Sequence, residues 1–338
     1  MKKVLLKIQH PKCSLFTSVV LTFILLVLSS CSNEEIPITD SESQNLSITE
    51  LLESFKTVNG SAKGVTSKSD DDNSPTFEVL SKALAQTKLA STVSKNRLTV
   101  FAPTDAAFAE LGLTTKNITT VDNLDQILLY HVIGMPVYSS DLVNGPVRTI
   151  NDAAVIINLD SGVMVNNATV TLADLKARNG VIHVIDKVLF PPSMNLVEKA
   201  SSLAPEFSIL IEAATKAGLA ETLMNGGPFT VFAPTNEAFG NLLASLDDFD
   251  SLDDFDTPEE IALLKDILLY HVKEGRVYSS DLSSDTVMTL GGSFDLDLET
   301  LTITDEQGGK SMLVQDLLNV QASNGVIHVI NAVILPSF

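Results

Sequence analysis

Residues 99–108 read TVFAPTDAAF, and residues 230–239 read TVFAPTNEAF. Two further blocks are repeated in the same order: ILLYHV at 127–132 and 267–272, and NGVIHVI at 179–185 and 324–330. The offset grows along the chain, so insertions separate blocks that are otherwise kept. A period near 140 residues is the size of a whole domain and too long for a solenoid unit. The chain therefore contains two copies of one fold.

Within each copy, helical patterns come first and strand patterns follow. The expected helices begin at Phe77 and Phe207, follow the caps Thr104 and Thr235, or end in the two Leu-Leu-Tyr-His sequences. The expected strands in the first copy are residues 99–101, 155–159 and 181–185. Those in the second copy are residues 230–232, 294–298 and 326–330. This order lacks strict βαβ alternation. It predicts an α+β fold and argues against a doubly wound sheet.

The predicted domains are residues 46–191 and 195–338, with residues 31–45 as a flexible acidic tether. Residues 46–55 have apolar positions at helical spacing, and Ser47 followed by Glu50 fits a capping box. Pro191-Pro192 makes the connection between the copies short and stiff. We therefore expect the two domains to have limited mutual freedom.

Residues 1–30 are predicted to be an export signal. Four lysines precede an apolar run at 19–28 that is too short for a comfortable membrane span. Leu28-Ser-Ser-Cys31 resembles a bacterial lipobox, and the acidic residues after Cys31 resemble a surface-export signal of Bacteroidetes-type lipoproteins. The resemblance implies lipidation of Cys31 and attachment to the outer membrane, facing outward. The alternative is an ordinary signal peptide in which Cys31 is incidental.

Composition excludes several classes of function. Cys13 and Cys31 are the only cysteines, and Cys13 lies in the predicted signal, so disulfide frameworks, thiolate zinc sites and cysteine nucleophiles are excluded. Beyond residue 30 the chain carries 18 basic and 42 acidic residues. Such a surface repels nucleic acid and anionic lipid. It suits an extracytoplasmic protein.

The repeated blocks resemble the fasciclin domain family, whose two signature segments match the FAPT and NGVIHVI blocks with Tyr-His between them. The resemblance covers nearly all of the chain after the tether. It implies two fasciclin-like domains, each a β-sandwich-like wedge with helices packed along it. It also implies an extracellular role in adhesion or matrix contact, without a cofactor or metal.

The resemblance also suggests partner-binding residues. The family's Tyr-His motif corresponds to Tyr130, His131, Tyr270 and His271, and its Asp-Ile pair corresponds to Asp174-Leu175 in the first copy and Asn319-Val320 in the second. The Asp that follows the last block is Asp186 in the first copy and Asn331 in the second. The first copy therefore has more of the family's adhesive pattern, and we expect a working face there.

Three chemical alternatives remain beside this interpretation. The motif histidines could form a proton shuttle or metal site, but His183 and His328 lie inside apolar strands and a third protein ligand is missing. These observations favour core histidines whose ring nitrogens bond to the backbone. Ser139-Ser-Asp141 and its copy could join a histidine in hydrolysis, although a capping role explains them as well. The acidic run 247–256 could bind calcium, but it lacks EF-hand spacing and favours a solvated insertion.

The leading hypothesis is a lipid-anchored, non-catalytic binding module at the cell surface, which contacts a protein or glycan partner in adhesion or matrix assembly. The second hypothesis is an accessory lipoprotein that holds a glycan or peptide for an outer-membrane uptake system. An enzyme acting through the histidines is the third and weakest, because no hydrolase, metalloprotease or nucleotide-binding motif is present.

Overall fold

The computed structural model describes residues 45–55, 75–246 and 251–337 of the 338-residue chain. The predicted signal peptide, Cys31 and almost all of the tether lie outside these ranges. Both repeats belong to one compact unit that runs from Ile38 to Phe338. Within the described ranges, none of the helices has both the length and the apolar character that a membrane crossing requires.

The first repeat has helices at its beginning and strands at its end, as predicted. Its helices are α2 (Ile48–Ser54), α3 (Glu78–Gln86), α4 (Ala90–Lys95), α5 (Asp105–Ala109), η1 (Ile118–Thr120), α6 (Leu124–Tyr130) and η2 (Ser139–Asp141). Its strands are β1 (Leu98–Pro103), β2 (Val132–Ile133), β3 (Gly145–Arg148), β4 (Ala154–Asn158), β5 (Met164–Val165), β6 (Ala168–Ala177) and β7 (Gly180–Ile185).

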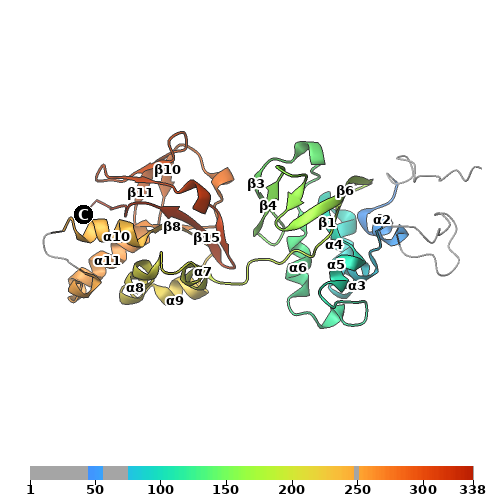
Figure 1. The fold of residues 1–338 in the computed structure, drawn as a ribbon, viewed down its shortest axis with the longest axis horizontal. Helices are drawn as coiled ribbons and strands as arrows, with labels where there is room; N and C mark the ends of the chain where they lie inside the picture. Colours follow the sequence, from blue (N-terminus) through green and yellow to red (C-terminus); the bar gives the residue numbers. More distant parts are fainter. Residues whose placement is uncertain (1–44, 56–74, 247–250, 338) are drawn as a thin grey trace, which may run out of the picture. The chain divides into compact units, whose positions relative to one another are not determined.

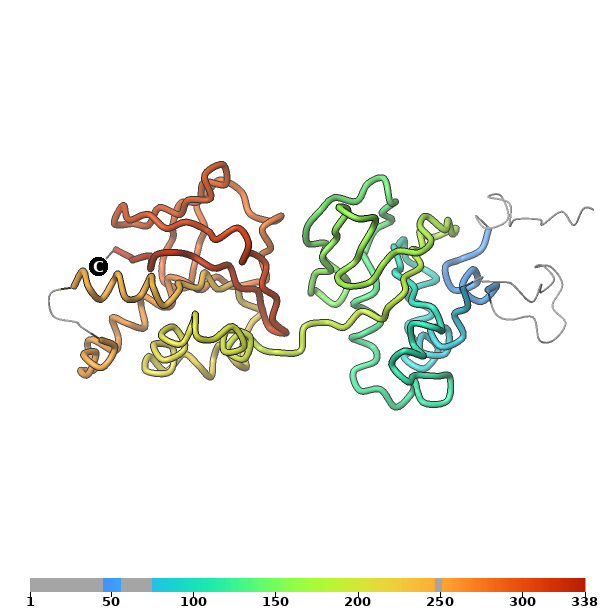
Figure 2. The backbone as a smooth tube through the Cα atoms, viewed as in Figure 1, coloured from blue at the N-terminus to red at the C-terminus, as the bar shows by residue number. Residues whose placement is uncertain are grey.

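The second repeat follows the same order (Figures 1 and 2). Its helices are α7 (Leu196–Ser202), α8 (Ser208–Lys216), α9 (Ala220–Asn225), α10 (Asn236–Leu243), η3 (Leu252–Asp254), α11 (Pro258–Tyr270), η4 (Ser279–Asp281) and η5 (Gln315–Leu317). Its strands are β8 (Phe229–Pro234), β9 (Val272–Glu274), β10 (Thr286–Met288), β11 (Ser293–Asp297), β12 (Thr302–Thr304), β13 (Lys310–Met312), β14 (Val320–Ala322) and β15 (Gly325–Ile330). The predicted α+β class is therefore confirmed for both copies.

The two signature blocks lie side by side in each repeat. In the first, β1 pairs in parallel with β7, from Leu98 opposite Gly180 to Pro103 opposite Ile185. In the second, β8 pairs in the same way with β15. The first repeat continues as one seven-stranded sheet, whereas the second has two four-stranded sheets. The long strand β6 of the first repeat corresponds to β13 and β14 of the second, with η5 between them.

The Asn-Gly pair explains why the last block is kept. The Asn179 side chain accepts the Ile48 N–H at 2.9 Å and donates to the carbonyls of Val93 and Asn96, so it joins α2 to α4. Gly180 has φ +153°, and a Cβ there would lie 1.9 Å from the Leu98 carbonyl oxygen. Only glycine fits this approach.

Helix caps follow the sequence prediction. Ser47 and Glu50 form a capping box at the start of α2, and Asn195 and Glu198 form the matching box at α7. Thr104 accepts a hydrogen bond from the Ala107 N–H at 3.2 Å at the start of α5. These caps satisfy N–H groups that the helix cannot pair internally.

Candidate functional site

His131, the histidine of the first Tyr-His motif, is the C-cap residue of helix α6 and is 2% exposed. Its Nδ1 lies 2.7 Å from the Ile127 carbonyl, and its Nε2 accepts the Leu189 N–H at 2.9 Å. Because Nε2 accepts, the proton resides on Nδ1 and the ring is neutral. Burial lowers the pKa of His131 to about 4.

His271 repeats this arrangement at the end of α11. It is 1% exposed, its Nδ1 lies 2.8 Å from the Ile267 carbonyl, and its Nε2 accepts the Ile334 N–H at 3.1 Å. Burial lowers its pKa to about 4 as well. Each ring therefore connects a helix end to the segment after the last strand.

The tyrosines of the same motif are also interior. Tyr130 donates to the Ala154 carbonyl at 2.8 Å and accepts from the Asn166 amide at 3.0 Å. Tyr270 donates to the Ser293 carbonyl and accepts the Glu306 N–H at 3.2 Å. Both rings are at most 1% exposed. The prediction that the Tyr-His motifs contact a partner is untested, and in this structure their polar atoms are bonded within the domain.

Asp174 caps a short helix. It has φ +60° in an irregular stretch of β6, and its carboxylate accepts the backbone N–H and the hydroxyl of Ser139, at the start of η2. Partial burial raises the pKa of Asp174, but the hydrogen bonds from Ser139 outweigh it, so the pKa lies below its ordinary value. Leu175 packs against the core of the first repeat.

In the second repeat the side-chain amide of Asn319 caps the corresponding short helix, η4. Asn319, at φ +57°, accepts the Ser279 N–H at 2.7 Å and donates to the Ser279 hydroxyl at 2.7 Å. The next pair behaves alike: Asp186 accepts the Thr169 N–H at 2.7 Å, and Asn331 accepts the Met312 N–H at 2.8 Å. The oxygen is common to both copies, whereas the charge belongs to the first copy alone.

The histidines of the last strands have both ring nitrogens bonded. His183 Nδ1 accepts the Asp174 N–H at 3.3 Å, so its Nε2 donates to the Val137 carbonyl at 3.0 Å. His328 makes the same two contacts, with Asn319 and Val277. Burial lowers the pKa of both rings. Among the described residues, the ring nitrogens of the motif histidines bond to backbone groups, so the suggested pairing of a histidine with Ser139 or Ser279 is not formed there.

In the part of the chain that the structure describes, no group of three or more His, Cys, Asp or Glu side chains is placed to hold an ion. Asp247 to Asp250 lie outside the described residues. The rest of the acidic run forms η3, where Ser251 and Asp254 make a capping box.

A contact between the repeats was not anticipated from the sequence. Tyr278 is 1% exposed; its hydroxyl accepts the Ala154 N–H of the first repeat at 2.7 Å and donates to Gln321 at 2.9 Å. Arg148 lies 5.5 Å from the Tyr278 ring centre and pairs with Asp281 at 3.1 Å. The first-repeat counterpart of Tyr278 is Tyr138 in an identical VYSSDL sequence, so the motif alone could not distinguish them.

A comparison with known protein families matches the Fasciclin domain model to residues 75–191 and 205–336. Protein sll1483 of Synechocystis sp. is 35% identical over 178 residues, which cover 52% of this chain and 92% of that protein. The transforming growth factor-beta-induced protein ig-h3 of Oryctolagus cuniculus is 30% identical over 256 residues, 71% of this chain but only 35% of that protein.

Similarity is also found to a mycobacterial protein and to a solved structure. The immunogenic protein MPB70 of Mycobacterium bovis is 32% identical over 129 residues, 36% of this chain and 66% of that protein. Among solved structures, the FAS1 domain pair from the insect cell adhesion molecule fasciclin I covers 76% of this chain and 96% of its own, at 20% identity and a TM-score of 0.37.

Proposed function

Because the chain belongs to the fasciclin domain family and contains two such domains, we propose that it is a non-catalytic binding module displayed on a bacterial cell surface. It contacts a protein partner in adhesion or matrix assembly. The observation that carries this proposal is the internal use of the motif side chains. Each motif histidine has both ring nitrogens bonded to backbone groups, so none of these four rings is free to act as a catalytic base.

The surface position rests on the sequence before the domains. Lipidation of Cys31 would hold the chain at the outer membrane, and residues 32–45 would separate the domains from it. The test is metabolic labelling with a clickable fatty acid in the native host. We expect label on the natural chain and none on Cys31→Ala, which should leave the membrane fraction. Protease added to intact cells should remove the natural chain, and full resistance would contradict display.

The binding role is tested with the full chain on an array of matrix proteins and glycans. Protein spots bound at micromolar concentration or better would support adhesion. Glycan spots alone, or a pull-down that recovers an outer-membrane transporter, would favour the uptake hypothesis instead. Turnover of ester or glycoside substrates that disappears in His131→Ala would contradict both.

A further inference from the structure

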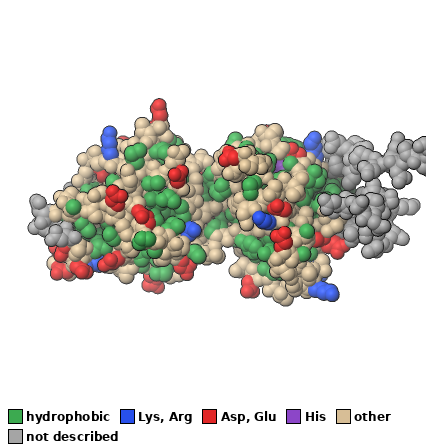
Figure 3. Space-filling model, in the orientation of Figure 1, with side chains coloured by type: hydrophobic (Ala, Val, Ile, Leu, Met, Phe, Trp, Pro, Cys, Tyr) green, Lys and Arg blue, Asp and Glu red, His purple; other side chains and the backbone are tan. Residues whose placement is uncertain are grey.

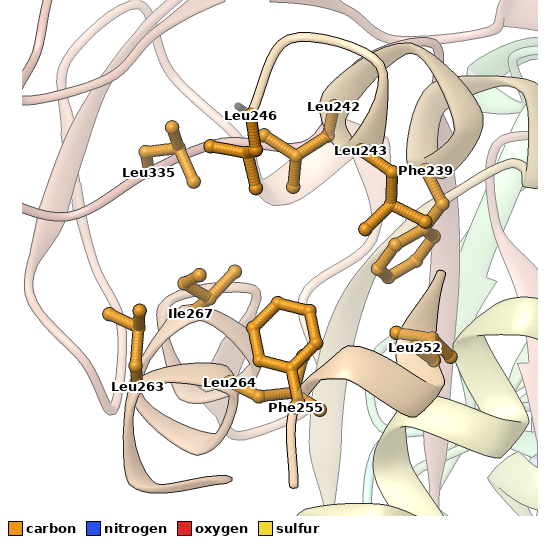
Figure 4. A pocket seen from close by; sticks show the side chains of 10 residues that line it. All are labelled: Phe239, Leu242, Leu243, Leu246, Leu252, Phe255, Leu263, Leu264, Ile267 and Leu335. Atoms are coloured by element: carbon orange, nitrogen blue, oxygen red, sulfur yellow. The ribbon is translucent and has the colours of Figure 1, made fainter. Parts of the chain in front are cut away.

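An apolar pocket of about 100 Å³ opens in the helical part of the second repeat (Figure 4). Its walls come from α10, η3, α11 and the stretch after the last strand. The lining side chains carry only carbon: Phe239, Leu242, Leu243, Leu246, Leu252, Phe255, Leu263, Leu264, Ile267 and Leu335. Phe255 and Leu264 are buried at 3% and 2% exposure, whereas Leu246 is 36% exposed.

The pocket is specific to the second repeat's longer helical segment. From Phe108 to Val132 the first repeat has 25 residues, whereas from Phe239 to Val272 the second has 34. The additional residues lengthen α10 to 8 residues, against 5 in α5, and α11 to 13, against 7 in α6, whereas η3 lies where the first repeat has η1. The fold shared by the two repeats therefore does not require the longer walls that α10 and α11 supply.

The size and lining of the pocket define what fits. A carbon-only lining offers water no hydrogen-bond partner, so a water molecule there is poorly held. An apolar cavity of about 150 Å³ accommodates benzene. The smaller volume here suits one branched aliphatic side chain, the size of leucine or isoleucine.

Acidic side chains outnumber basic ones beside the pocket, where Lys216 donates to the Leu252 carbonyl at 2.5 Å and Lys265 follows Leu264 on α11. Asp253 follows Leu252 in η3, and Asp256 follows Phe255. On α11, Glu259 lies four residues before the lining residue Leu263 and Asp266 three after it, which places both beside Leu263 on the helix surface. Figure 3 shows acidic side chains at this end of the second repeat. A cationic partner is attracted to such a rim, and an anionic one is repelled.

We propose that this pocket binds a peptide segment of a partner protein through one leucine or isoleucine side chain flanked by lysine or arginine. The aliphatic side chain fills the pocket, and the basic residues face the acidic rim. The proposal deepens the binding function above and rests on it, since it assigns the protein partner a docking point in the second repeat.

The probe is the peptide acetyl-Lys-Lys-Gly-Leu-Gly-Lys-Lys-amide, titrated into the full chain and followed by methyl NMR. We expect shifts confined to the leucine and isoleucine methyls of the pocket. Replacing the peptide leucine by alanine should weaken binding by about tenfold or more, because it removes roughly three buried carbon atoms. A peptide with glutamates in place of the lysines should not bind. Equal binding of the alanine peptide would reduce the effect to charge alone and overturn the proposal.

Three protein variants locate the site. Leu242→Phe enlarges a lining side chain and should abolish the methyl shifts, whereas Leu111→Phe changes its exposed first-repeat counterpart and should leave them intact. Glu259→Lys with Asp266→Lys should weaken binding without filling the pocket. Unchanged binding by Leu242→Phe, or no binding of the leucine peptide at millimolar concentration, would refute the pocket. If Leu242→Phe still binds the protein spots of the array, the pocket is not the docking site and the proposed function stands. If the natural chain binds no spot of the array but binds the leucine peptide, the pocket is supported and the proposed function is contradicted.

Discussion

At the scale of single residues, the motif histidines hold neighbouring segments together as neutral rings. Each uses one nitrogen as donor and the other as acceptor toward the backbone, in both repeats. A protonated imidazole has no acceptor, so protonation breaks the bond that Leu189 or Ile334 donates. The structure of the domain therefore depends on the charge state of these rings.

This dependence predicts loss of stability in mild acid. His131 and His271 have a pKa of about 4 in the fold and about 6.5 when unfolded. Unfolding therefore takes up protons between pH 6.5 and 4, and the stability present above pH 6.5 is lost as the pH falls toward 4. At pH 5 we expect the free energy of unfolding to be lower by about 1–2 kcal/mol per histidine than at pH 7, which is measured as a falling thermal midpoint. His131→Gln with His271→Gln should be less stable at pH 7 but show a flatter pH profile above pH 5, and an unchanged slope would contradict the assignment.

The carboxylate of Asp174 separates a capping role from a contact role. Asp174→Asn should leave the thermal midpoint within about 2 °C, because Asn319 already makes the same cap in the second repeat. Asp174→Ala should lose about 1 kcal/mol or more, since it removes the cap and leaves a non-glycine residue at φ +60°. Loss of partner binding in the stable Asp174→Asn variant would show that the charge itself is the contact. Retained binding would leave it a structural residue.

At the scale of elements, the Asn-Gly pair fixes the approach of the last strand to the first. Gly180→Ala should destabilise the first repeat by more than about 4 kcal/mol, because its Cβ would overlap the Leu98 carbonyl and its φ is unfavourable for alanine. Gly134→Ala is the control, since no atom lies within 4 Å of its added Cβ. Thermal unfolding of both variants checks this, and a Gly180→Ala protein as stable as the control would contradict the packing.

The sequence alone was sufficient for several of the elements, but not for the ten-residue strand β6 or for the pairing of the strands. The caps at Ser47 and Thr104 and the alternating strands follow local rules, so they could be read from neighbouring residues. The parallel contact of β1 with β7 depends on residues about 80 positions apart, for which one sequence holds no local signal. A core position for His131 follows from the sequence, but the partners of Tyr130 and His131 do not, because Ala154 and Leu189 lie far along the chain.

At the scale of the whole molecule, one tyrosine distinguishes the repeats. Tyr278 is buried against the first repeat, whereas its counterpart Tyr138 is 37% exposed. Arg276 lies two residues before Tyr278, and Pro136 occupies the corresponding place in the first repeat. The Arg276 side chain donates to the carbonyls of Ala322, Ser323 and Gly325. The two copies therefore share the VYSSDL motif, but the residues that contact its tyrosine and the residue two positions before that tyrosine differ between them.

The amide of Ala154 reports on this contact. Tyr278→Phe removes a hydroxyl that accepts the Ala154 N–H, but Gln321 Oε1 also accepts this N–H at 3.0 Å, so the change should cost at most about 1 kcal/mol. Native-state hydrogen exchange at Ala154 should then accelerate by up to about fivefold. Tyr138→Phe should leave that rate unchanged. Equal rates in both variants would mean that the hydroxyl does not protect the amide.

The pairing of first and last strands also determines when each repeat can finish folding. Strand β1 leaves the ribosome long before β7. Until residue 185 has been made, the edge of β1 that pairs with β7 has no partner strand. The same holds for β8 until residue 330. Each repeat therefore closes only near the end of its own synthesis. A repeat that is still being synthesised therefore remains unfolded, and accessible to translocation machinery or chaperones, for almost the whole time of its synthesis.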